Sequence, residues 1–252
     1  MPKELTISDG VIFRQEAKYN ANLVGPPIPN VKVFDCGFAA DQSEYDWTEE
    51  EDNGTTIAHS SVDGGAVTIT ASGTNDDCGE LAHTAQWSAA SNCGMLAKVK
   101  ISAITAVNVC IGFVDAIENT DDHVAMEISA AALRNCSTTA DFCGMIFDTD
   151  QTTDVWYLGA SNNGTEGTPV AATGSLAPEA DTYFYVSVQT DTAGNVLFYY
   201  GTSIRELKPV GILPTAIAYT SANLLAPYVG FIARDTNAQV CTVSRIVTWQ
   251  DN

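Results

Sequence analysis

Apolar and polar positions alternate along the chain in short runs that are separated by turn residues at nearly regular intervals. Between residues 95 and 201 these runs are rich in β-branched and aromatic residues, and Gly, Asp, Asn and Thr separate them. Such runs are typical of half-buried strands. We expect this region to form one side of an all-β sandwich, with strands at residues 107–114, 142–147, 153–158, 182–188 and 195–200.

Further strands are expected before and after this central region. In the run 95–101, Lys98 and Lys100 lie on one face and Val99 on the other, because side chains alternate along a strand. The best helical candidate, residues 123–133, also fits a strand followed by a loop. The sequence therefore predicts an antiparallel all-β fold, with additional strands at residues 31–34, 65–70, 79–84, 228–234 and 240–249.

Length and composition predict a folded body with one extension. The chain has 252 residues, which exceeds the usual single-domain size, but all-β sandwiches often reach this length undivided. Hydrophobic residues make up 45% and charged residues 17%, which excludes a disordered chain. We expect one β-sandwich body, residues 31–252, preceded by a segment of different character.

Residues 1–30 are that segment, and we expect an extended N-terminal arm. Each proline in residues 25–30 fixes its own φ and restricts its predecessor, so this stretch is a stiff linker. The residues before it are too apolar for a solvated tail. The arm therefore needs a surface on its own body, on a neighbouring copy or on another protein. The contact candidates are Val11, Ile12, Phe13, Tyr19, Leu23, Pro26 and Pro27.

Charge is distributed unevenly along the chain. Residues 1–32 contain four basic and three acidic residues, a balance of 4 − 3 = +1, so the rest carries −20 − 1 = −21. A body this acidic repels nucleic acid and anionic membranes, so neither is expected as a partner. No apolar run approaches the roughly 20 residues that cross a bilayer. The N-terminus also lacks the pattern of a secretory signal, so we expect synthesis in the cytoplasm.

The seven cysteines form an odd set without a C-x-x-C pair. Several lie among apolar residues, where a thiol behaves as a small buried hydrophobe. Free structural thiols are favoured over disulfides or a zinc site.

A weak calcium pattern occurs at Asp148, Asp150 and Asp154, because carboxylates at alternating positions can converge on a hard cation. Thr153 stands where such a loop needs Gly, and Gly159 stands where it needs Glu. A polar turn between two strands is the favoured interpretation. We expect no metal and no cofactor.

No catalytic constellation is recognisable. Hydrolysis of glycans needs two carboxylates held across a sugar bond, and no Glu-x-Asp-x-Glu strand is present. The acidic residues 44–52 fit a solvated loop better than a catalytic strand. A G-x-S-x-G motif and paired metal-ligating histidines are also missing. The sequence therefore predicts that the protein is not an enzyme.

Two tryptophans are candidate glycan contacts. Trp47 and Trp156 could stack on sugar rings if they were exposed. Core packing is the favoured alternative for both.

The order of strands and turns resembles the concanavalin A-like, or laminin-G-like, jelly-roll superfamily. More narrowly, residues 33–249 resemble structural proteins of tailed phages that decorate or cement the capsid or form head fibres. The residues that carry this resemblance are 110–115, 144–156, 180–183 and 191–198.

This resemblance implies an antiparallel jelly-roll β-sandwich and a structural role in the virion. The implied function is a non-enzymatic decoration or cement protein on the capsid surface, anchored by the arm. Its partners would be the major capsid protein and further copies of itself, with a trimer suggested by analogy. The alternative is a lectin-like glycan-binding module or the domain of a receptor-binding fibre.

Overall fold

The computed structural model describes residues 31–38, 47–52, 54–60, 65–117, 123–129, 132–135, 141–214 and 224–251. The expected arm lies outside the described residues, and so do all seven of its contact candidates. Helix is nearly absent from the described residues, which contain the short 3₁₀ turns η3 (Ala89–Ser91) and η4 (Ile204–Glu206). None of the helices in this part of the chain has the length and apolar character that a membrane span requires.

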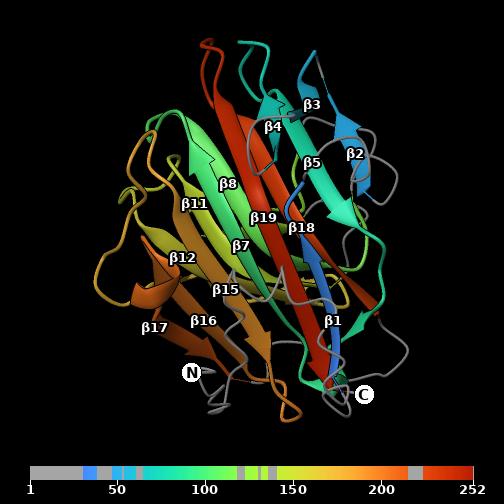
Figure 1. Cartoon of the computed structure of the whole chain (residues 1–252). Helices are drawn as coiled ribbons and strands as arrows, with labels where there is room; N and C mark the ends of the chain where they lie inside the picture. The colour runs from blue at the N-terminus through green and yellow to red at the C-terminus, as the bar shows by residue number, and fades with distance from the viewer. Residues whose placement is uncertain are drawn as a thin grey trace. The chain divides into compact units, whose positions relative to one another are not determined.

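Eight strands form one sheet, which we call sheet A (Figure 1). The order is β17-β16-β15-β7-β19-β4-β3, neighbours along this path are antiparallel, and β1 also pairs with β19. The bounds are β17 (Lys208–Leu213), β16 (Val196–Gly201), β15 (Phe184–Thr190), β7 (Gly94–Ile101), β19 (Val240–Asp251), β4 (Ala66–Thr70), β3 (Thr56–Ser60) and β1 (Val31–Cys36).

Nine strands form the second sheet, sheet B, in the order β13-β12-β11-β8-β18-β5-β2. These neighbours are antiparallel too, β14 pairs with β12 and β6 pairs with β18. The bounds are β13 (Thr165–Glu166), β12 (Trp156–Asn162), β11 (Phe142–Asp148), β8 (Val107–Val114), β18 (Leu224–Ala233), β5 (Cys78–His83), β2 (Trp47–Glu51), β14 (Val170–Ala171) and β6 (Trp87–Ser88).

The two stacked sheets confirm the predicted antiparallel β-sandwich, but the expectation for residues 95–201 was wrong. These residues do not form one side of the sandwich. β8, β11 and β12 belong to sheet B, whereas β7, β15 and β16 belong to sheet A. A run of alternating apolar residues identifies a strand, but it does not reveal which sheet the strand joins, because both sheets bury a face in the same core.

Two segments differ from their predicted conformation. The acidic run is not wholly a loop, because Trp47–Glu51 pairs with Cys78–His83 as strand β2. Its charges are accommodated locally, since the Glu49 carboxylate contacts His59 and that of Glu51 accepts the Ile57 amide. The helical candidate instead contains the hairpin of β9 (Met126–Ser129) and β10 (Ala132–Asn135), which agrees with the alternative of strand and loop.

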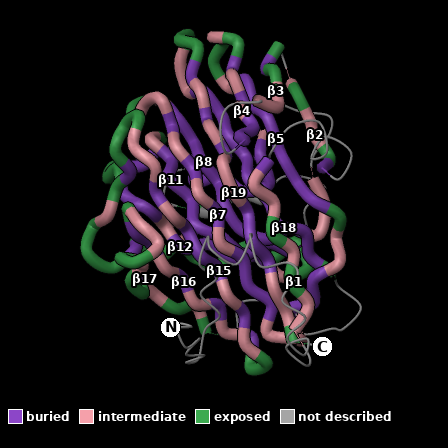
Figure 2. Tube along the Cα trace, in the orientation of Figure 1, coloured by how far each residue is buried: buried purple, intermediate pink, exposed green. Residues whose placement is uncertain are grey.

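The main core lies between the two sheets (Figure 2). Alternate residues such as Val99 and Val186 in sheet A, and Ile111 and Val229 in sheet B, have no exposed surface. A group of rings packs at one end of this core, with centroids 5.4 to 5.9 Å apart around Trp156. Burial of these side chains supplies the main driving force for the sandwich.

A second apolar cluster covers the other face of sheet B, where the segment 123–128 packs against the strands. Tyr228 is fully buried there and lies over Gly230, where a Cβ atom would collide with the Tyr228 hydroxyl. That hydroxyl contacts the Glu80 carboxylate and accepts the Ala125 amide at 2.8 Å. Sheet B is therefore covered on both faces, and this covering positions the site described next.

Candidate functional site

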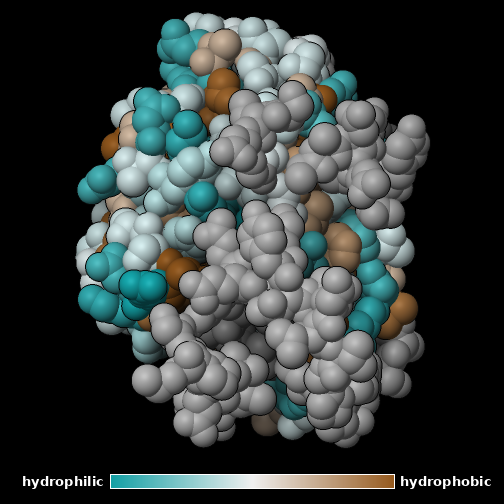
Figure 3. Space-filling view, in the orientation of Figure 1, coloured by the Kyte–Doolittle hydropathy of each residue, from teal (hydrophilic) through white to brown (hydrophobic). Residues whose placement is uncertain are grey.

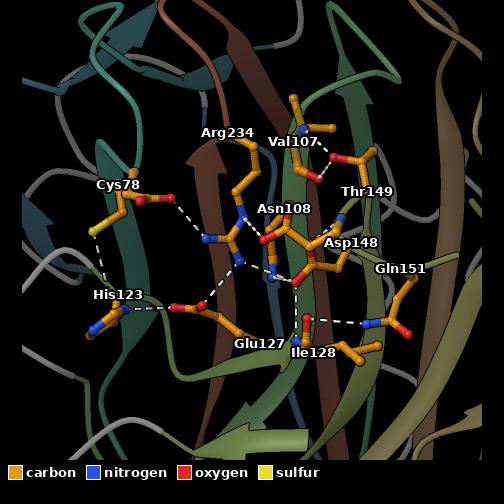
Figure 4. Close-up of polar contacts among 12 residues, drawn as sticks. Cys78, Val107, Asn108, His123, Glu127, Ile128, Asp148, Thr149, Gln151 and Arg234 are labelled. Atoms are coloured by element: carbon orange, nitrogen blue, oxygen red, sulfur yellow. Dashed lines mark hydrogen bonds and ion pairs between the residues drawn. The ribbon is translucent and has the colours of Figure 1, made fainter. Parts of the chain in front are cut away.

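A polar pocket of about 330 Å³ lies where four separate segments meet (Figure 4). Asp76 comes from the loop between β4 and β5, and Arg234 directly follows β18. The segment that covers sheet B contributes Glu127, and the turn after β11 contributes Asp150. The complete lining is Asn75, Asp76, His123, Glu127, Ile128, Asp150 and Arg234.

Arg234 is the centre of the pocket and contacts four carboxylates. Its guanidinium lies 2.9 Å from Asp76, 3.0 Å from Glu127 and 3.2 Å from Asp148. The Nε atom lies 3.6 Å from Asp150. Glu127 and Asp148 are buried with Arg234, whereas the carboxylates of Asp76 and Asp150 reach the surface. One cation against four carboxylates leaves a local charge of 1 − 4 = −3.

Asp148 joins the pocket to sheet B. Its carboxylate accepts the side-chain amide of Asn108 at 2.7 Å and the backbone amides of Ile128 at 3.0 Å and Asp150 at 3.1 Å. Because it is fully buried, these donors and Arg234 replace the water that it would otherwise bind. Asp148 therefore holds the covering segment, the turn and the end of β18 together.

The covering segment has further anchors at both ends. His123 Nδ1 lies 2.8 Å from Glu127, and the Cys78 thiol donates to the His123 carbonyl at 3.3 Å. At the other end, Gln151 donates to the Ile128 carbonyl at 3.2 Å. Glu127 is thus fixed between His123 and Arg234, so the pocket is built in advance of any ligand.

The electrostatics of the pocket follow from burial and from this excess of carboxylates. Burial raises the pKa of Asp150, and the charges of Asp148, Asp76 and Glu127 raise it further, while Arg234 opposes them. Burial acts to lower the pKa of Arg234, but the nearby Asp148 and Glu127 outweigh it and the pKa is raised. The arginine therefore stays charged, and Asp150 is a carboxyl group that protonates more readily than an ordinary aspartate.

The loop that carries Asp76 is shaped by its own polar residues. The Asp77 carboxylate accepts the Thr74 amide at 3.1 Å and contacts the Ser72 hydroxyl. Gly73 has a φ of +95°, and Asp76 itself has a φ of +69°, which Asp tolerates better than most residues. This turn directs Asp76 toward Arg234 and leaves Asn75 exposed at the pocket mouth.

The two tryptophans predicted as glycan contacts do not lie at a surface. Trp47 is 6% exposed and Trp156 is 0% exposed. Trp47 packs against Phe34 and Phe38, and Trp156 packs among Phe147, Phe184 and Tyr200. A sugar ring cannot reach either indole in the folded protein, so the core alternative is correct.

The three aspartates of the weak calcium pattern are not brought together. Asp148 is buried against Arg234, Asp150 is at the pocket rim and Asp154 is exposed farther along the turn. No group of three or more potential metal ligands occurs in the part of the chain that the structure describes. The segment is a polar turn between β11 and β12. The six described cysteines are thiols and not disulfides, and five of them are buried.

No sequence pattern predicted Arg234, Glu127, Asp76 or Asn75 as site residues. One signal was available, because Arg234 ends an apolar strand in a chain with only 11 basic residues. Its partners Glu127 and Asp148 are 107 and 86 residues away in sequence. No local spacing could have indicated that they meet.

Comparisons with known proteins identify solved structures of similar fold, but no family model or curated protein of similar sequence. No protein-family model matches the chain, and no curated protein matches it. A solved protein of unknown function from Shewanella oneidensis MR-1 aligns with a TM-score of 0.58 at 9% identity, covering 97% of both chains. Peanut lectin aligns with a TM-score of 0.56 at 14% identity, covering 87% of this chain and 97% of the lectin. The carbohydrate recognition domain of Emp47p also gives 0.56, at 12% identity, covering 90% of this chain and 100% of that domain.

The comparisons also correct the expectation that the protein is not an enzyme. A structure described as a native glycosidic hydrolase aligns with a TM-score of 0.57 at 12% identity, over 86% of this chain and 95% of that one. An endo-β-1,4-glucuronan lyase from Trichoderma reesei gives 0.54 at 8% identity, over 87% and 95%. Enzymes and lectins share this architecture, so the missing sequence motifs do not exclude catalysis. What the matches show of this chain is its architecture, the concanavalin A-like jelly-roll fold of lectins and glycosidases.

Proposed function

We propose that the protein binds carbohydrate and that the ligand occupies the polar pocket around Arg234. The observation that carries the proposal is a preformed pocket of 330 Å³ lined by carboxylates, an amide, an imidazole and a guanidinium. This volume is at the lower end of the range of about 300–1,000 Å³ for small-molecule sites. The lectin-like fold of its structural neighbours supports the same class of ligand.

The chemistry of the rim suits sugar hydroxyl groups. The carboxylates of Asp76 and Asp150 accept hydrogen bonds, and the exposed Asn75 amide both donates and accepts them. Arg234 and the buried carboxylates below fix these groups in place. A polyol can therefore bind without reorganising the pocket, which limits the entropy lost on binding.

The test is a glycan array with the wild-type protein and two rim variants, Asn75→Ala and Asp150→Asn. Both residues are exposed, so the variants should fold normally, and we expect the bound glycan signal to fall at least about tenfold. Asp154→Asn is the matched control, because Asp154 is exposed on the same turn but does not line the pocket. Absence of glycan binding by the wild type, or equal binding by both rim variants, would refute the proposal.

The capsid role predicted from the sequence is a second, separate proposal. It is supported by the resemblance to phage decoration proteins and by the apolar arm, whose residues lie outside the described residues. The major capsid protein, self-association as a trimer and a place on the virion surface belong to the same proposal. Deleting residues 1–30 should abolish binding to purified capsids, and retained binding would contradict the anchoring role.

A further inference from the structure

The side of sheet A that points away from the core differs in charge from the rest of this acidic protein. The neighbouring strands β7, β15 and β16 contain no Asp or Glu, although the chain has 31 of them. β7 instead places Lys98 and Lys100 on its partly exposed face, while Ala97 and Val99 are buried in the core. Figure 3 shows hydrophilic, neutral and hydrophobic residues side by side on the visible part of the molecule. A strip without carboxylates therefore carries two lysines.

Both lysines are held by the same aromatic ring. Lys98 Nζ lies 4.3 Å from the ring centroid of Tyr183, and Lys100 Nζ lies 5.4 Å from it. Residues two apart on a strand are separated by about 7 Å, so one ring can contact the side chains of both lysines. Cation–π attraction reduces the motion of two long side chains and keeps their ammonium groups together.

The two lysines differ in their ion pairs from Arg245, another basic residue of this sheet. Among the residues that the structure describes, no carboxylate forms an ion pair with Lys98 or Lys100. The neighbouring cation Arg245 differs, because both its Nε and Nη2 atoms contact Asp35, at 2.9 and 2.6 Å. The acidic residue Asp181 lies beside the end of β7, since its backbone amide donates to the Ile101 carbonyl.

We propose that Lys98, Lys100 and Tyr183 form a binding site for an acidic glycan, distinct from the pocket around Arg234. Two adjacent ammonium groups match the oxygens of a carboxylate or sulfate group on a sugar. Neutral polar groups beside the lysines can form hydrogen bonds with the sugar hydroxyls. Tyr185 is the cross-strand partner of Lys98, and the partly exposed Gln189 lies farther along β15.

Nucleic acid is disfavoured as the ligand for two reasons. The net charge of −20 repels a polymer with closely spaced phosphates more strongly than a glycan with one charge per sugar. Binding of single strands also depends on bases stacking on aromatic rings. The Tyr183 ring already holds the two lysines, so it offers no such platform.

The experiment measures the affinity of the full chain for polygalacturonate oligosaccharides, dextran sulfate and uncharged dextran by calorimetry at low salt. We expect at least one acidic glycan to bind more tightly than dextran, and its binding to weaken as the salt concentration increases. Lys98→Ala with Lys100→Ala should weaken binding about tenfold or more. Arginine at both positions should retain binding, and Asp181→Asn should strengthen it.

Lys208→Ala is the matched control, because Lys208 is an exposed lysine of the same sheet on β17. It should bind like the wild type, and so should the pocket variant Asn75→Ala. Preference for polygalacturonate identifies a carboxylate ligand, and preference for dextran sulfate identifies a sulfate ligand. The proposal is overturned if neither acidic glycan binds, if the double alanine variant binds unchanged, or if a DNA oligonucleotide binds as tightly as the glycans. Loss of binding in Asn75→Ala would also overturn it, by placing the acidic ligand in the pocket.

Discussion

Replacing Arg234 with methionine should destabilise the protein strongly, although Arg234 lies outside the strands. Methionine keeps much of the side-chain length but removes the charge. Asp148 and Glu127, with side chains 0% and 4% exposed, then lose their cation in a buried setting. Breaking a buried ion pair by removing one partner costs about 3–5 kcal/mol.

The expected loss of stability comes mainly from these two buried carboxylates. The side chains of Asp76 and Asp150 are 40% and 57% exposed, so water compensates for much of their loss. A loss of about 4 kcal/mol corresponds to a fall in Tm of roughly 8–16 °C for a domain of this size. Differential scanning calorimetry and urea unfolding would measure both quantities.

The matched control is Arg245→Met. Its ion pair with Asp35 is more exposed, at 28% and 41%, and exposed pairs contribute only about 0–1 kcal/mol. A double-mutant cycle adds Asp148→Asn to Arg234→Met, and the double variant should lose less stability than the two single variants added together. If Arg234→Met unfolds at the same temperature as Arg245→Met, or if the cycle is additive, the reasoning about the buried pair is refuted.

Three further outcomes are expected. Trp156→Ala should lose about 3–5 kcal/mol of stability because it empties a fully buried site, and an unfolding curve like that of the wild type would contradict its role in the core. Asp150→Asn should raise stability at neutral pH, because the raised pKa of Asp150 means that its ionisation costs the folded state more than the unfolded state. This gain should vanish below the pKa of about 3.9 that an aspartate has in the unfolded chain. If unfolding experiments at several pH values showed that the gain persists below that pH, the raised pKa would not be its cause. In the native protein, iodoacetamide followed by mass spectrometry should modify Cys36 before Cys93, because burial raises the pKa of Cys93 to about 12, and equal rates would contradict this.

The strands were predictable from sequence where local pattern determines them. Residues 107–114 coincide with β8, and residues 240–249 lie within β19. The sheet to which each strand belongs was not predictable, because pairing such as that of β19 with β7 and β4 joins distant parts of the chain. Strand β2 was missed because three consecutive glutamates suggest a solvated loop. The contacts of Glu49 with His59 and of Glu51 with the Ile57 amide, and the pairing of β2 with β5, form only in the folded protein.

The site was less predictable than the fold. Carboxylates were sought at close spacing on one strand, whereas the pocket combines residues from four segments around one arginine. Asp148 and Asp150 were singled out as weak cation ligands, and the cation beside them is a guanidinium of the same chain. Trp47 and Trp156 were candidate ligand contacts, but both are buried. An aromatic residue in a β-sandwich is more often a core residue than a ligand contact.

The position of β19 has a consequence for synthesis of the protein. Val240–Asp251 is the last of the described strands in sequence, and it lies between β7 and β4 inside sheet A. Before residues 240–251 have emerged from the ribosome, β7 and β4 each present an unpaired edge that can recruit strands from other nascent chains. We therefore expect sheet A to be completed only after β19 has been synthesised, and a truncated product that lacks β19 to aggregate.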